Sequence, residues 1–333
     1  MKECKIRNDW TLDEVQEIYT LPLMELVFRA TEVHRSNHPI GQIQVCQLLS
    51  IKTGACSEDC SYCSQSSRYE TEVKVEKLMP PEEVYSLAKT AKEAGATRFC
   101  MGAAWREVKD NADFEKVLAM VRSVRSLGLE VCTTLGMVDG KQAERLKEAG
   151  LTSYNHNIDT SKDYYKEVIS TRTYEDRLRT LKNIQEAGIT ICSGGIIGMG
   201  ESELDRMKML QALANLEVHP GSVPINALVP IKGTPMEGKP RVSVFEMVRM
   251  IATARILMPK SKVRLSAGRV LMNETEQGLC FIAGANSIFS GDKLLTTQNT
   301  ALDQDARIFQ IWGLSPMTAD PVAVEGRAQE VFA

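Results

Sequence analysis

A unit made of a short apolar run, a polar loop, an amphipathic helical pattern and a closing glycine recurs along most of this chain. It restricts the possible folds more than any other feature. Between the runs, apolar residues return at helical spacing, as at Val84, Ala88 and Ala91. Alternating strands and helices build a parallel sheet, and eight such units imply a closed α/β barrel of the TIM-type (β/α)8 class. The runs that predict its strands lie at 43–51, 97–103, 129–135, 152–158, 189–196, 222–228, 262–267 and, as the shortest, 287–289.

The segments around these units define three predicted regions. Residues 1–39 are expected to form an N-terminal helical cap, because Thr11 and Glu14 make a capping-box pattern and helical spacing continues to residue 38. Residues 40–312 form the barrel. Residues 313–333 have no regular apolar period, so we expect a mobile, disordered C-terminal tail. The connection 229–243 is longer than an ordinary loop and predicts a lid or an interface loop.

Charge and cysteine usage restrict the partners and the compartment. The net charge is -3, from 40 basic and 43 acidic residues without a long run of one sign, so neither nucleic acid nor a membrane surface is expected as a partner. No apolar stretch is long enough for a membrane span. Nine cysteines, an odd number, and no apolar leader argue against a secreted disulfide framework and indicate a reducing cytoplasm. A small-molecule substrate is the expected partner.

The stretch GACSEDCSYCSQ places Cys56, Cys60 and Cys63 in CxxxCxxC spacing. Three soft ligands on one short loop indicate a metal site. A structural zinc site is the alternative, but it needs four protein ligands, and no second CxxC or Cys/His pair stands nearby. An iron-sulfur cube fits better, because three thiolates leave one iron free to bind the amine and carboxylate of a small molecule.

Three more cysteines, Cys100, Cys132 and Cys192, fall in predicted strands two, three and five. An isolated cysteine in a strand is usually a small buried hydrophobe. If these three share an interior layer, however, they can hold a second cluster, with a fourth ligand from another strand. Cys4, Cys46 and Cys280 are interpreted as ordinary cysteines of undetermined role.

Polar residues gather at the predicted strand ends, where the active site of a (β/α)8 barrel lies. Asn155, Asn157 and Asp159 alternate in strand four and therefore share one face, and Asn226 follows in strand six. These amides and the carboxylate suit a polar small ligand, whereas satisfied polar packing inside the barrel is the alternative. Gly194-Gly195 would let the backbone approach a ligand closely, although a tight turn explains it equally well.

The cysteine loop, with Tyr62 before its last cysteine, resembles the radical S-adenosylmethionine enzymes. Together, GACSEDCSYCSQ, YNHNIDTS, TRTYEDRL, CSGGIIGMGE, PINALVPIKGTP and VRLSAGR resemble the biotin synthase family in order and spacing, over roughly residues 40–290. Ser57 and Ser64 stand where that family commonly has proline, which is expected to loosen the loop without removing a ligand.

The resemblance implies a set of cofactor ligands. Cys56, Cys60 and Cys63 would hold a 4Fe-4S cluster whose open iron chelates S-adenosylmethionine. The ligands of a 2Fe-2S cluster would be Cys100, Cys132, Cys192 and Arg264, although from the residues alone Arg264 is a carboxylate clamp, because a guanidinium is normally protonated. No catalytic side chain is expected beyond the cluster ligands.

The resemblance also implies the contacts to the organic ligands. For S-adenosylmethionine these would be Tyr62 at the adenine, Asn157 and Asp159 at the ribose and nearby groups, Gly194 and Gly195 at the methionine amine, and Arg177 at the methionine carboxylate. Asn155, Asn157 and Asn226 would contact ureido and ribose polar atoms as substrate-binding residues.

The implied activity is a radical sulfurtransferase reaction. A 5'-deoxyadenosyl radical would abstract hydrogens from dethiobiotin, and the 2Fe-2S cluster would donate the sulfur of biotin. A flavodoxin- or ferredoxin-type electron donor and a cytoplasmic homodimer are implied as well. Two alternatives stay open: another radical S-adenosylmethionine enzyme, such as a methylornithine or hydrogenase-maturation relative, which would not need the second ligand set, and a non-catalytic iron-sulfur sensor or electron carrier.

Overall fold

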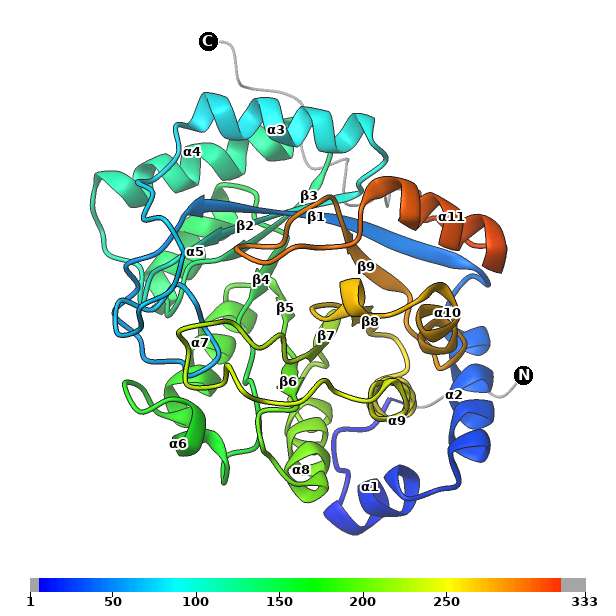
Figure 1. Cartoon of the computed structure of the whole chain (residues 1–333). Helices are drawn as coiled ribbons and strands as arrows, with labels where there is room; N and C mark the ends of the chain where they lie inside the picture. Colours follow the sequence, from blue (N-terminus) through cyan, green and yellow to red (C-terminus); the bar gives the residue numbers. More distant parts are fainter. Residues whose placement is uncertain (1–5, 319–333) are drawn as a thin grey trace.

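The computed structural model describes residues 6–318 and contains a closed barrel of parallel strands. Each strand pairs in parallel with the next, and β1 also pairs with β9, which closes the sheet (Figure 1). The predicted (β/α)8 barrel is therefore confirmed. The strands around it are β1 (Gln42–Lys52), β2 (Arg98–Ala103), β3 (Glu130–Thr134), β4 (Ser153–Asn155), β5 (Thr190–Cys192), β7 (Ser222–Ala227), β8 (Lys262–Leu265) and β9 (Ser287–Ser290).

The fifth predicted strand is divided in two. β5 ends at Cys192, and β6 (Gly195–Ile197) continues the same course and pairs with β7. The break falls at Gly194, where an added Cβ would lie 2.0 Å from the Pro224 carbonyl oxygen of β7. Glycine is therefore required here because two backbones approach each other closely.

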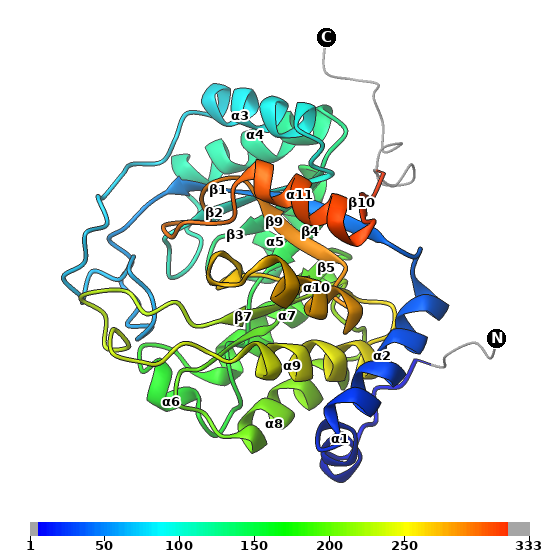
Figure 2. The same cartoon turned by 45° about the vertical axis from the view of Figure 1, so that its right-hand side comes forward.

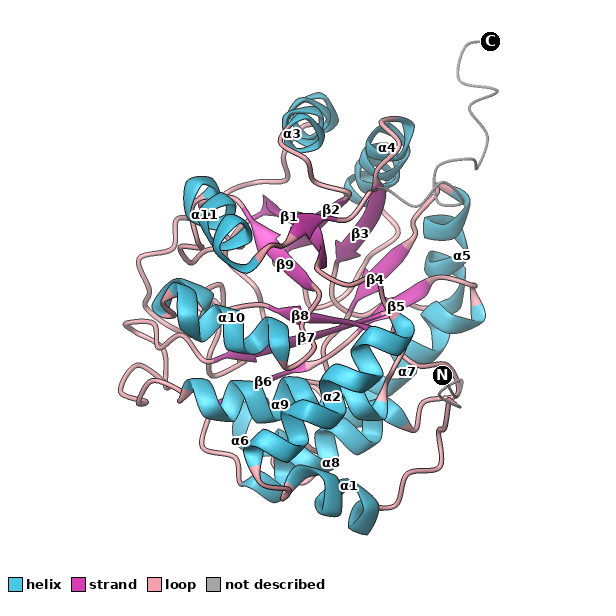
Figure 3. Cartoon of the chain, turned by 90° about the vertical axis from the view of Figure 1, so that its right-hand side faces the viewer, coloured by secondary structure: helices cyan, strands magenta, loops and turns pink. Residues whose placement is uncertain are grey.

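Helices surround the barrel on its outer side, as Figure 3 shows. Most follow the predicted spacing and bury one apolar face against the strands, as α4 does with Phe114, Val117 and Val121. The helices are α3 (Pro81–Glu93), α4 (Ala112–Ser126), α5 (Gly140–Glu148), α6 (Tyr165–Val168), α7 (Tyr174–Glu186), α8 (Glu203–Ala214), α9 (Val244–Leu257), α10 (Glu274–Ile282) and α11 (Leu302–Trp312), with a 3₁₀ turn at Arg269–Leu271.

The N-terminal segment forms two helices instead of the single helical stretch expected over 9–38. The capping box of Thr11 and Glu14 begins α1 (Leu12–Tyr19) as predicted. α2 (Leu23–Asn37) starts only after Pro22, because proline has no N–H to continue a preceding helix. α1 packs against α8 and α9, and α2 lies along α9 (Figure 2).

The predicted C-terminal tail begins with an ordered pair of residues. β10 (Ser315–Pro316) adds to the edge of β1, next to Gln42 and Ile43. The rest of the tail, residues 319–333, lies outside the described residues.

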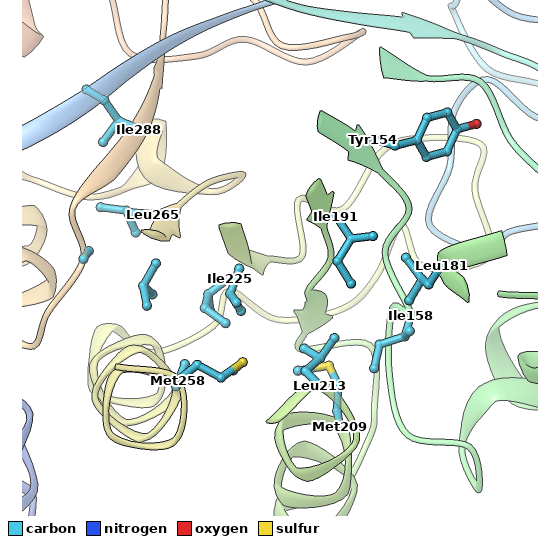
Figure 4. Close-up of a cluster of buried hydrophobic side chains, with 14 of the residues drawn as sticks. Tyr154, Ile158, Leu181, Ile191, Met209, Leu213, Ile225, Met258, Leu265 and Ile288 are labelled. Atoms are coloured by element: carbon cyan, nitrogen blue, oxygen red, sulfur yellow. The ribbon is translucent and has the colours of Figure 1, made fainter. Parts of the chain in front are cut away.

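The main core fills the layer between the strands and the helices. Figure 4 shows a part of it, where Ile191 and Ile225 of the strands lie near Met209 and Leu213 of α8, and Leu265 lies next to Ile288. All of these side chains are buried. The barrel interior, by contrast, carries the polar and sulfur-containing side chains described below. No helix within residues 6–318 is both long and apolar enough to cross a membrane.

Candidate active site

A cavity of about 320 Å³ lies at the carboxyl ends of the barrel strands. Val229 and Ile231 of the long 229–243 connection line it, as do residues 294–297 after β9. It brings together twelve of the residues that the sequence singled out: Cys56, Cys60, Tyr62, Cys63, Cys100, Cys132, Asn155, Asn157, Asp159, Arg177, Asn226 and Arg264. Cys192, Gly194 and Gly195 are not among the residues that line the cavity. The predicted strand-end site is therefore one cavity, and a lid function of 229–243 stays a prediction.

The cysteine loop leaves β1 through two left-handed residues, Gly54 (φ 73°) and Ala55 (φ 53°). A left-handed alanine costs roughly 1–2 kcal/mol, so the surrounding contacts must hold this turn. They include hydrogen bonds from the Cys56 N–H to Gln65 O (2.9 Å) and from the Cys63 N–H to Cys60 O (2.9 Å). The loop is thus folded with its three thiols on the cavity wall.

Asp59 anchors the loop to the segment before α7. Its carboxylate accepts hydrogen bonds from the backbone N–H groups of Ser170 (3.0 Å) and Thr171 (3.1 Å). Although burial alone would raise it, the pKa of Asp59 is lowered to about 2 by hydrogen bonds from these two residues. The carboxylate is therefore ionised at neutral pH and fixes the loop between Cys56 and Cys60.

Burial raises the pKa of Cys60 to about 12 and that of Cys63 to about 11. Thiolates at these positions therefore need a cation beside them, such as a metal. Within residues 6–318, no three His, Cys, Asp or Glu side chains come together closely enough to hold a single metal ion. Thiolates bound to one ion lie roughly 4 Å apart, given metal–sulfur bonds of about 2.3 Å. A cluster fits the triplet better, because each thiolate then binds its own corner iron.

The sequence motifs did not single out Arg172, which lies beside the loop, or Glu58, which lies within it. Arg172 donates from Nη2 to Cys60 Sγ (3.5 Å), and its Nε lies 3.9 Å from the buried Glu58 carboxylate. Glu58 also pairs with Arg106 at 3.5 Å. The signal that could have found Arg172 was its place in TRTYEDRL, next to a predicted helix start. Its charge favours a thiolate at Cys60.

Asp159 and Arg177 form a buried ion pair on the cavity wall. Arg177 Nη2 donates to Asp159 Oδ2, and its Nε donates to the Tyr165 hydroxyl (3.0 Å). Asp159 is 1% exposed and Arg177 5%. An arginine at such a helix position usually forms an ion pair on the surface. Arg177 instead forms a buried one. A guanidinium has five donor hydrogens, so it keeps capacity for a ligand carboxylate.

β4 ends at Asn155, so Asn157 and Asp159 follow the strand instead of alternating within it as predicted, and Asp159 is left-handed (φ 66°). The amides of Asn155 and Asn157 form a chain of side-chain contacts that ends at a thiol. Asn155 Nδ2 lies 3.4 Å from Asn157 Oδ1 and 3.3 Å from Cys192 Sγ, and Asn157 Oδ1 also accepts from the Gly194 N–H (3.2 Å). An added Cβ at Gly195 would meet Met209 Sδ at 2.0 Å. Packing within the protein therefore accounts for both glycines, and their contact with a ligand stays a prediction.

The side chain of Asn226 makes hydrogen bonds to backbone groups near the ends of two strands. These bonds use half of its hydrogen-bonding capacity. Its Nδ2 donates to Gly195 O (2.9 Å), and its Oδ1 accepts from the Ala267 N–H (3.2 Å). An amide has two donor hydrogens and two acceptor lone pairs, so one of each is left to face the cavity. The side chain can serve both the barrel and a ligand.

Replacing Asn226 with alanine is expected to destabilise the chain as well as weaken ligand binding. A buried backbone group that loses its partner costs about 1–3 kcal/mol, so thermal unfolding is expected to shift to lower temperature. Asn226→Gln keeps both the amide donor and the amide acceptor and serves as the matched control, with a smaller shift. An unchanged melting temperature for Asn226→Ala would show that these backbone bonds contribute little.

A second group of thiols lies deeper in the barrel. Cys46, Cys100, Cys132 and Cys192 are each no more than 3% exposed and cluster with Phe289, apart from the main core. The strand pairings place Cys100 beside Cys132. The expected interior layer of Cys100, Cys132 and Cys192 is therefore present. It also contains Cys46, which no sequence motif singles out.

Arg264 projects from β8 into this layer. Its Nη2 donates to Cys46 Sγ (3.3 Å), its Nη1 to Cys192 Sγ (3.6 Å) and its Nε to the Ser287 hydroxyl (3.0 Å). The neighbouring Cys132 thiol and the charges of Arg264 and Arg98 lower the pKa of Cys192 to about 6, against the effect of burial. A thiolate is therefore favoured at Cys192 more than at the other thiols of this layer, whose pKa values are raised.

Two polar atoms beside this layer are buried without a hydrogen-bond partner. They are Arg98 Nη1 and Ser222 Oγ, which belong to the strand neighbours of Cys46 and Cys192. Unsatisfied donors are costly in a protein interior, and a group with several acceptor sulfurs would satisfy them. The thiols and these donors fit an iron-sulfur cluster at this position.

Solved structures with the same architecture support the fold. Methylornithine synthase (PylB) matches with a TM-score of 0.77 and 20% identity, covering 92% of this chain and 94% of that one. HydG, a maturase of the [FeFe]-hydrogenase, matches with a TM-score of 0.79 and 18% identity, covering 95% and 74%. At these identities the likeness shows a shared fold alone.

Sequence relatives define the family. The model of the Radical SAM superfamily matches residues 50–213, and that of the Biotin and Thiamin Synthesis associated domain matches 224–315. The biotin synthase of Cytophaga hutchinsonii is 62% identical over 94% of this chain and 93% of its own. The mitochondrial biotin synthase of Arabidopsis thaliana is 57% identical over 93% and 82%. The resemblance predicted from the motifs is confirmed: the chain belongs to the biotin synthase family of radical S-adenosylmethionine enzymes.

Proposed function

We propose that this chain converts dethiobiotin to biotin by radical sulfur insertion, with S-adenosylmethionine and iron-sulfur clusters as cofactors. Family membership supports the reaction, and one observation supports it in this molecule. A single cavity of about 320 Å³ is lined by both the loop cysteines and two cysteines of the interior layer. A substrate held there would lie between two groups of cysteine ligands, each able to bind a cluster. A sensor with one cluster would not require the second group.

Each cysteine set would hold one cluster. Cys56, Cys60 and Cys63 would bind a 4Fe-4S cluster, and Cys100, Cys132, Cys192 and Arg264 a 2Fe-2S cluster. When bound, the clusters supply one-electron cleavage of S-adenosylmethionine and the sulfur that enters the product. Proteins bind such clusters through thiolates, and buried hydrogen-bond donors near the sulfurs tune them.

The other cavity residues would bind and orient the two organic molecules. Arg177 would hold the methionine carboxylate, and Asp159 and Asn157 the ribose and nearby groups. Gly194 and Gly195 would contact the methionine amine, and Tyr62 the adenine. Asn155, Asn157 and Asn226 would contact the ureido and ribose atoms. Such fixed polar groups limit the reaction to particular hydrogens of the substrate.

The surroundings of the reaction complete the proposal. The reductant would be a flavodoxin- or ferredoxin-type protein, and the enzyme would work as a cytoplasmic homodimer. The regions would divide as a helical cap at 1–39, the radical S-adenosylmethionine barrel at 40–312 and a C-terminal tail at 313–333. The absence of long charge runs, with 40 basic and 43 acidic residues, supports a small-molecule substrate rather than a nucleic acid.

Reconstitution with labelled sulfide tests both the reaction and the sulfur source. The protein is loaded anaerobically with iron and isotopically labelled sulfide, freed of excess, and given dethiobiotin, S-adenosylmethionine and a reductant beside unlabelled sulfide. We expect labelled biotin and a matching loss of the 2Fe-2S absorption, because a short-lived radical reacts with atoms that are already held next to it.

The controls separate the parts of this proposal. Omitting S-adenosylmethionine is expected to leave dethiobiotin unchanged and the label in the protein. Unlabelled biotin with an intact 2Fe-2S spectrum would overturn the cluster as the sulfur source. No biotin under any condition, despite loaded clusters, would overturn the proposed substrate.

A further inference from the structure

We infer that Cys46 is a fourth thiol ligand of the second cluster and shares one iron position with Arg264. The inference rests on the proposed function, because it assumes that a cluster binds among Cys100, Cys132 and Cys192. It adds Cys46, which the sequence alone marks as an ordinary cysteine. In this view the thiolate of Cys46 binds iron whenever the guanidinium of Arg264 does not.

The position of Cys46 supports this role. It is fully buried on β1 and belongs to the same cluster of side chains as the three predicted thiol ligands. Residue 48, two positions further along β1, pairs with Cys100 of the neighbouring strand. Side chains two positions apart share a face, so Cys46 and Cys100 both point into the barrel. The layer thus offers thiols from four strands: β1, β2, β3 and β5.

Arg264 occupies the gap between the first and last of these thiols. Its Nη2 reaches Cys46 Sγ (3.3 Å) and its Nη1 reaches Cys192 Sγ (3.6 Å). A protonated guanidinium donates hydrogen bonds and has no lone pair for iron, whereas a thiolate is the usual ligand of such clusters. At this position the chain therefore places a poor ligand and a good one within hydrogen-bond distance of each other.

Two buried guanidinium groups lie beside the layer. Arg98 stands opposite Cys46 in the pairing of β1 with β2, and its Nη2 already pairs with Glu130 at 2.6 Å. Arg264 instead directs its guanidinium at Cys46, Cys192 and the Ser287 hydroxyl. A thiolate bound to iron at Cys46 would therefore have a guanidinium within hydrogen-bond distance.

The test measures the second cluster in holoenzyme carrying Arg264→Leu, Cys46→Ala or both substitutions. Cys280→Ala is the matched control, since Cys280 is equally buried but belongs to the main core. Iron and acid-labile sulfide are counted per chain, the visible absorption is recorded, and the iron–sulfur stretching bands are compared by resonance Raman. Circular dichroism melting confirms that each variant is folded.

We expect Arg264→Leu to keep the second cluster with bands of four-thiolate ligation. Cys46→Ala in that background is expected to weaken iron retention on the order of 10-fold or more. Equal iron, sulfide and Raman bands with and without Cys46 in both backgrounds would overturn the inference. Wild-type protein that never assembles a 2Fe-2S cluster would instead overturn the proposed function.

Discussion

Alanine at Cys56, Cys60 or Cys63 is expected to abolish reductive cleavage of S-adenosylmethionine. Each thiolate would hold one corner of the cluster that binds this molecule, and two remaining thiolates cannot retain a cube with a stable open iron. All three side chains line the cavity, and their loop is fixed by backbone hydrogen bonds that alanine leaves in place. The loss therefore reports on the metal site rather than on the fold. Production of 5'-deoxyadenosine under anaerobic reducing conditions measures it.

Two comparisons make this experiment specific. Cys280→Ala changes a cysteine of the main core and is expected to preserve 5'-deoxyadenosine production. The 2Fe-2S absorption is expected to survive in the loop variants, because the thiols of the interior layer belong to the barrel strands and not to the loop. Retained cleavage in any one of the three loop variants would remove that cysteine from the ligand set.

The barrel could be predicted from the sequence because each of its units carries its own local signal. Apolar runs, helical spacing and capping residues report on neighbours within a few positions, and these decide strands and helices. The misjudged places depended on contacts across the fold. The break in the fifth strand falls at Gly194, which lies close to the Pro224 carbonyl oxygen of a neighbouring strand, and no local pattern predicts this contact. The division of the N-terminal helix is different, because Pro22 is a local signal for a helix start.

The site was predictable to the extent that a residue type suggests its own chemistry. A cysteine triplet or three alternating polar residues in a strand stand out, and the structure brings them into one cavity. Arg172 and Cys46 did not stand out, because an arginine and a buried cysteine are ordinary residues in a barrel. Their importance comes from what lies next to them, a thiol of the loop for Arg172 and Arg264 for Cys46.

The Asp159–Arg177 pair carries the other large expected effect, because it supports the fold and the proposed cofactor site together. Asp159→Asn removes the charge but suits the left-handed backbone at this position (φ 66°), which alanine would strain. The Arg177 guanidinium then stays buried without its counter-charge. Removing one partner of a buried ion pair costs about 3–5 kcal/mol, so the melting temperature is expected to fall markedly. Binding of S-adenosylmethionine to the reconstituted protein is expected to be lost as well.

A double variant separates these two effects. Asp159→Asn combined with Arg177→Gln removes both charges and leaves neutral groups that can hydrogen-bond to each other. Because no unpaired charge is then buried, most of the lost stability is expected to return, as it does when both members of a buried pair are replaced. The affinity for S-adenosylmethionine is not expected to return, since the carboxylate for the ribose and the guanidinium for the methionine carboxylate are both absent. If the double variant regained cofactor binding with its stability, the pair would be structural. The two contacts would then belong to other residues of the cavity, and Arg172, which also lines it, would be a candidate for the carboxylate.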